Sequence, residues 1–131
     1  MEVAHLAVIC TGLLGLLVFG LGLMVSLTRG SSKTNYGYKI DPTDPLYKRV
    51  RAHANAAEYA PMMALLILYL GTRHPGTWLL GTFVLATLSR YLHAMGMITC
   101  PSLDRPHPLR FAGALGTYVT GLVLAVAVFV V

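Results

Sequence analysis

Residues 3–28 read VAHLAVICTGLLGLLVFGLGLMVSLT, and this stretch of 26 residues contains no Lys, Arg, Asp or Glu. A helix needs about 20 predominantly apolar residues to cross the hydrocarbon core of a bilayer. The last 21 residues of the chain, 111–131, are equally free of formal charge. The two segments therefore predict two membrane-spanning helices, one at each end of the sequence.

The composition of the whole chain favours a membrane protein. Of its 131 residues, 11% are charged, whereas soluble proteins have about 25%. Hydrophobic residues make up 56%, which excludes a disordered chain and argues against a soluble domain, because so much uncovered apolar surface would aggregate. The length suits one domain, residues 1–131. The net charge of +5 is explained by cations in the loops, so no nucleic-acid partner is expected.

The middle of the chain admits two interpretations. Its charge-free runs, residues 59–72 and 75–89, hold only 14 and 15 residues, which by itself indicates re-entrant or interfacial segments. Alternatively, each run continues through its charged flank as a full helix. We prefer this interpretation because backbone at membrane depth must be helical or buried in protein. The prediction is an all-α membrane protein, a four-helix transmembrane bundle with approximate helices 3–28, 46–71, 76–97 and 109–131.

The connection between the second and third helices, residues 71–76, is short and turn-like, so these two helices form a hairpin. The polar flanks at the start of one helix and the end of the other then lie at the same depth. The loops at this end carry most of the cations, whereas the opposite side has only Arg73. The positive-inside rule predicts a multi-pass integral membrane protein with basic loops in the cytoplasm and both termini on the opposite side.

A polar cluster is expected at the depth of these flanks. Arg51, Asn55 and Glu58 are spaced i, i+4, i+7 and so lie on one helical stripe. Arg90 and His93 share a face of the third helix because they are spaced i, i+3. Ionisable residues inside a membrane are costly and usually face a cavity or one another. The cluster is therefore a candidate functional site.

Two explanations of this cluster remain open at this point. One is a structural ion-pair network that fixes helix register. The other is a ligand site, favoured because Arg51 and Arg90 outnumber the single carboxylate of Glu58. Arg51 and Glu58 are about 10 Å apart along a helix and cannot pair with each other. The surplus positive charge suits an anion, and arginine binds carboxylates in bidentate fashion.

No metal site is predicted. Cys10 and Cys100 lie in unrelated segments and have no zinc-ligand spacing. Neither His53 nor His93 has a second ligand four residues further on.

Two motifs resemble those of one membrane-protein family. Residues 51–61, RAHANAAEYAP, contain the complete RAHxNxxE pattern, and residues 89–93, SRYLH, resemble the family's third-helix motif of Arg followed three positions later by His or Tyr. The family is that of membrane-associated proteins in eicosanoid and glutathione metabolism (MAPEG), which includes microsomal glutathione transferases. The resemblance extends over essentially the whole chain.

The resemblance implies a homotrimer that binds glutathione between neighbouring subunits on the cytoplasmic side. It implies a glutathione transferase or peroxidase whose second substrate is a lipophilic electrophile or lipid hydroperoxide arriving from the membrane lipid. The glutathione carboxylates would meet arginines, and its ammonium would meet Glu58. The implied glutathione-binding residues are Arg51, His53, Asn55, Glu58, Tyr59, Arg90 and His93.

The family's catalytic arginine stabilises the glutathione thiolate at the start of the fourth helix, since a nearby cation lowers the pKa of a thiol. Arg105 and Arg110 are both candidates, and Arg110 is favoured because it immediately precedes the apolar run. Met97 replaces a tyrosine common in the family. Two further hypotheses stay open: a non-catalytic lipid-binding scaffold of the same fold and, more weakly, a transporter that uses Glu58 and the histidines as relays.

Overall fold

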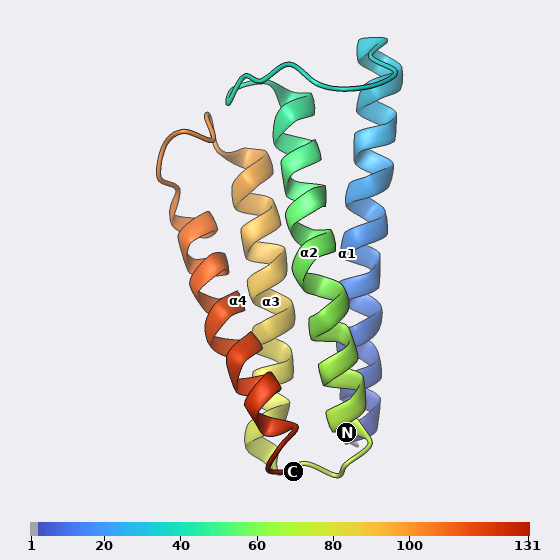
Figure 1. Ribbon diagram of the computed structural model, residues 1–131, viewed down its shortest axis with the longest axis vertical. Helices are drawn as coiled ribbons and strands as arrows, with labels where there is room; N and C mark the ends of the chain where they lie inside the picture. Colours follow the sequence, from blue (N-terminus) through green and yellow to red (C-terminus); the bar gives the residue numbers. More distant parts are fainter. Residues whose placement is uncertain (1–2) are drawn as a thin grey trace.

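The computed structural model describes residues 3–131 and consists of four helices joined by short loops (Figure 1). The helices are α1 (Val3–Ser32), α2 (Pro45–Gly71), α3 (Thr77–Thr99) and α4 (Pro108–Ala127). α1 packs mainly on α2, and α3 packs mainly on α4, while α2 also contacts both α3 and α4. The predicted all-α fold of four helices is confirmed.

The helix bounds differ most from the expected ones at the ends of α1 and α4, and by no more than two residues elsewhere. α1 continues four residues beyond the charge-free run. The Arg29 guanidinium donates to the carbonyl oxygens of Thr34 (3.3 Å) and Gly37 (2.6 Å) and so holds the chain that leaves the helix. α4 ends at Ala127 rather than at the last residue. There the chain tightens into a turn, in which the Phe129 amide donates to the Val126 carbonyl.

α1 and α4 are long and apolar enough to cross a membrane, by length and composition. The outer surface of the bundle is also strongly apolar, with Phe19 81% exposed, Phe111 71% and Phe129 87%. Water would oppose the exposure of so many large apolar side chains, whereas lipid tails accommodate them.

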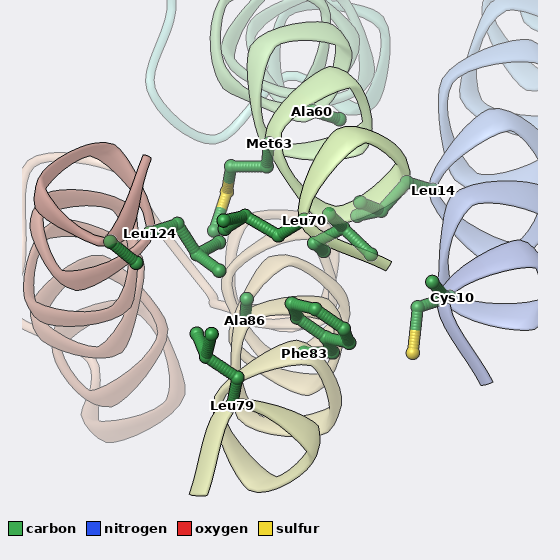
Figure 2. Packing of buried hydrophobic residues seen from close by; sticks show 12 residues of the cluster. Cys10, Leu14, Ala60, Met63, Leu70, Leu79, Phe83, Ala86 and Leu124 are labelled. Atoms are coloured by element: carbon green, nitrogen blue, oxygen red, sulfur yellow. The ribbon is translucent and has the colours of Figure 1, made fainter. Parts of the chain in front are cut away.

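The core lies between all four helices (Figure 2). Phe83 of α3 and Leu70 of α2 are completely buried there, and Leu14 of α1 and Leu124 of α4 close the cluster from either side. Figure 2 shows their side chains converging on the space between α2 and α3. This packing fixes the rotation of each helix and therefore decides which polar residues face outward.

The two loops at the end of the bundle opposite the chain termini are tied to each other (Figure 1). The Leu103 amide donates to the Pro42 carbonyl at 2.9 Å, and the Lys48 ammonium donates to the Cys100 carbonyl at 2.9 Å. α2 begins firmly at this end, because Asp44 accepts a hydrogen bond from the Tyr47 amide at 2.8 Å and Pro45 suits the first position of a helix. These contacts thus hold the start of α2 beside the end of α3.

Candidate functional site

Arg90 of α3 lies at the centre of the polar cluster and is only 1% exposed. One terminal nitrogen of its guanidinium donates to Asn55 Oδ1 of α2 at 2.6 Å, and the other donates to Thr117 Oγ1 of α4 at 3.1 Å. Its Nε atom has no partner within residues 3–131. One buried cation therefore joins three helices through neutral oxygen atoms.

Two tyrosines cover Arg90 on the side of α2 and α4. The guanidinium carbon lies 5.2 Å from the ring centroid of Tyr59, within the range of a cation–π contact. The Tyr59 ring meets Tyr118 of α4 edge to face, with centroids 5.8 Å apart, and the two hydroxyl oxygens are 3.3 Å apart. The tyrosine pair thus closes the gap between α2 and α4 at the depth of Arg90.

Arg51 and Glu58 lie on the same side of α2 as Asn55, because residues three or four apart are neighbours on a helix. Both side chains are exposed. Within residues 3–131 the one ion pair is Lys39–Asp41, at 3.8 Å in the first loop. The described part of the chain therefore contains no ion-pair network that could explain Arg51 and Glu58, and their charges are free to meet a ligand or another subunit.

Arg110 and His93 line a cavity of about 270 Å³ together with four residues of the last loop and α4 (Pro106, His107, Phe111 and Ala114). Nη1 of Arg110 donates to the carbonyl oxygens of Leu103 (3.0 Å) and Arg105 (3.1 Å), which orients the guanidinium. The buried Nδ1 atoms of His93 and His107 have no partner among the described residues. The cavity therefore combines an oriented guanidinium and two histidines with a mostly apolar wall.

Close packing of α3 on α4 places His93 against this cavity. A Cβ atom added to Gly113 would lie 2.6 Å from the Cα atom of His93, and one added to Gly116 would lie 2.9 Å from the Cβ atom of Ser89. Only glycine permits backbones to approach so closely.

Most of the predicted site residues share one side of the bundle. We name this side the α2–α4 face and define it by Arg51, Asn55, Glu58, Tyr59, Arg110 and Tyr118, with Arg90 and His93 of α3 beneath it. Two predicted residues lie apart from it. His53 lies against α1, where a Cβ atom added to Gly22 would be 3.2 Å from its Nε2 atom. Arg105 lies exposed in the last loop and contributes its carbonyl oxygen to Arg110.

Sequence reasoning did not find Thr117, Tyr118 or His107. Tyr118 lies on the same stripe of α4 as the cavity residues His107, Phe111 and Ala114, at a spacing of i, i+4, i+7, i+11. That spacing was readable in the sequence, but it acquired meaning only once α4 was placed beside α2.

The fold and this cluster define an all-helical membrane protein with polar side chains set between apolar helices. The comparison with known families agrees, since the model for the MAPEG family matches residues 7–130. The chain therefore belongs to the MAPEG family, a family of membrane proteins related to glutathione and eicosanoid metabolism. Neither the curated proteins nor the solved structures gave a match.

Proposed function

We propose that the protein is a glutathione-dependent transferase or peroxidase that acts on lipophilic electrophiles or lipid hydroperoxides within the membrane. The observation that carries this proposal is the α2–α4 face, where Arg51 and Glu58 are exposed and have no charged partner in the described chain. We place this face at membrane depth. Charges in such surroundings are costly unless a partner neutralises them.

Glutathione fits these residues chemically. It carries two carboxylates, one ammonium and one thiol, and the face offers arginines, a single carboxylate and several hydrogen-bonding groups. We assign the ammonium to Glu58 and a carboxylate to Arg51. Asn55 and Arg90 act together, since they are already joined by a hydrogen bond of 2.6 Å. Tyr59 and His93 are the remaining residues that we propose one chain contributes to glutathione binding.

The thiol of glutathione supplies the nucleophile. Arg110 is our candidate for stabilising the thiolate, because it lines the cavity beside His93, whereas Arg105 is exposed outside that cavity. The hydrogen bonds from Arg110 to two loop carbonyls hold its guanidinium in place before the substrate binds. Such preorganised positive charge is an effective way to stabilise a developing anion.

We further propose a homotrimer in which glutathione lies between neighbouring subunits. His53 lies against α1, away from the α2–α4 face of its own chain, and we assign it to the site of a neighbouring subunit. We place all four helices across the membrane, with the two tied loops in the cytoplasm, because these loops and the adjoining helix ends carry most of the cations.

The decisive experiment uses the purified protein in detergent. Glutathione binding is measured by calorimetry and by the ultraviolet absorbance of the thiolate. Turnover is then measured with chlorodinitrobenzene, in which sulfur displaces chloride, and with a lipid hydroperoxide, which glutathione reduces. We expect binding and at least one of the two activities. Absence of binding at millimolar glutathione contradicts the proposal, whereas binding of lipophilic ligands without any turnover supports the scaffold alternative.

A further inference from the structure

We propose that Tyr118, paired with Tyr59, forms the inner end of the glutathione site, which is the end farther from the two tied loops, and binds the α-carboxylate of the γ-glutamyl residue. This inference rests on the proposed function and adds to it an orientation for the peptide and a residue that no motif indicates.

The first observation is the unused hydrogen-bonding capacity of the tyrosine pair. The two hydroxyl oxygens are 3.3 Å apart, so one hydroxyl donates to the other. The second hydroxyl proton then has no acceptor within residues 3–131. Tyr118 is 54% exposed. The next turn of each helix, farther from the two tied loops, presents exposed apolar side chains, Met62 on α2 and Leu122 on α4. A hydroxyl in such surroundings gains from an acceptor that a ligand supplies.

The second observation is the length of the polar part of the face. Arg51 precedes Tyr59 by eight residues on α2, and Arg110 precedes Tyr118 by eight residues on α4. Eight residues of helix span about 12 Å. An extended tripeptide spans about 10 Å. The distance from the arginine end to the tyrosine end of the face therefore suits one tripeptide.

The third observation sets the direction of the peptide. Glu58 is the one carboxylate on the face, and it directly precedes Tyr59, so it lies near the inner end. The single ammonium of glutathione belongs to its γ-glutamyl residue, so this residue lies innermost when the ammonium meets Glu58. The α-carboxylate is attached to the same carbon as the ammonium and consequently falls at the depth of the tyrosine hydroxyls. The glycine carboxylate then reaches the arginines at the outer end.

Arg90 supplies positive charge near the tyrosine pair, which favours a carboxylate there. Its guanidinium lies over the Tyr59 ring at 5.2 Å and is held by Asn55 and Thr117. Its positive charge has no anion within the described residues. A carboxylate at the tyrosine pair supplies that anion nearby, and a hydrogen bond from a phenol to a charged oxygen is stronger than one to a neutral oxygen.

The experiment compares the wild type and one variant, Tyr118→Phe, for their binding of four related ligands. Binding of glutathione, γ-glutamylcysteine, cysteinylglycine and a glutathione whose γ-glutamyl α-carboxylate is amidated is measured for the wild type and for Tyr118→Phe. We expect Tyr118→Phe to weaken glutathione and γ-glutamylcysteine by about tenfold or more, which is the usual effect of losing a hydrogen bond to a charged group. Cysteinylglycine should bind both proteins equally, and the amide, whose oxygen is neutral, should be weakened less than glutathione. Tyr69→Phe, which removes an exposed phenol near the other end of α2, is the matched control and should bind like the wild type.

The outcomes separate this inference from the proposed function. Failure of the wild type to bind glutathione overturns both. Normal binding by the wild type together with an unchanged affinity of Tyr118→Phe overturns only the inference, as does an equal loss for glutathione and its amide. The wild type alone also provides a test that needs no stable variant, because equal affinities for glutathione and its amide are incompatible with a bound α-carboxylate.

Discussion

The guanidinium of Arg90 donates to Asn55 Oδ1 at 2.6 Å, so a residue of the third helix is fastened to the second helix inside the bundle. A buried cation whose partners are all neutral depends strongly on each of them, because losing one leaves part of the charge unsatisfied. Asn55 therefore has a structural role in addition to its proposed role in binding.

Replacing Asn55 by leucine tests this role. We expect Asn55→Leu to lower the free energy of unfolding by about 1–3 kcal/mol, the usual cost of an unsatisfied buried donor. Thermal unfolding in detergent measures the effect. Asn35→Leu makes the same change at an exposed position of the first loop and serves as the control. Equal losses of stability in the two variants would contradict the role of the Arg90–Asn55 bond.

The contact of Gly113 with His93 predicts a sharp difference between two glycines of α4. In Gly113→Ala the new Cβ atom would overlap the His93 backbone, so α3 and α4 must separate. Overpacking of this kind costs about 1–3 kcal/mol, and the displacement of His93 should also weaken glutathione binding. In Gly121→Ala nothing lies within 4 Å of the new atom, and the variant should be as stable as the wild type or slightly more stable. Melting temperatures that fall equally would refute this packing.

The two candidate catalytic arginines are separated by their surroundings. Arg110→Ala removes a cation from the cavity wall and should reduce the rate of the thiol reaction by about a hundredfold or more. The thiolate absorbance of bound glutathione should decrease at neutral pH, because the pKa of the thiol rises when the positive charge is removed. Arg105→Ala retains the backbone carbonyl that Arg110 uses and should keep nearly full activity. A greater loss in Arg105→Ala than in Arg110→Ala would reverse the assignment.

Glu58 offers a test of binding that leaves the fold intact. Its side chain is exposed and forms no ion pair with the described residues, so Glu58→Gln should melt at the wild-type temperature. Glutathione affinity should fall by about tenfold or more, because the ammonium loses a charged partner. Asp41→Asn removes a carboxylate in the first loop and should bind glutathione normally. Unchanged affinity of Glu58→Gln would place the ammonium elsewhere.

The subunit arrangement can be measured directly. We expect native mass spectrometry of the protein released from detergent to give the mass of three chains. Mixing subunits that carry Arg110→Ala with subunits that carry His53→Ala should partly restore the rate of the thiol reaction, because some interfaces then combine an intact Arg110 with an intact His53 of a neighbour. A monomer that binds glutathione with full affinity would disprove a site shared between subunits.

Much of the fold could be predicted from the sequence because long charge-free runs indicate membrane-spanning helices. Residues 3–28 and 111–131 were sufficient to predict α1 and α4, and the short turn at Pro75 predicted the pairing of α2 with α3. Helical periodicity also placed Arg51, Asn55 and Glu58 on one stripe. These features are local, so they follow from the order of the residues alone.

Only the tertiary structure decided which of these side chains meet. Helical spacing could not show that Tyr118 touches Tyr59, that His53 faces α1, or that Arg110 rather than Arg105 lines the cavity beside His93. Those relationships depend on the rotation of each helix about its axis. Burial of Phe83, Leu70 and Leu124, together with the close approach allowed by Gly113, determines that rotation, because packing couples residues that lie far apart in the chain. The sequence by itself therefore determined the helices and the side chains they carry, while packing determined how the side chains of the candidate site are arranged.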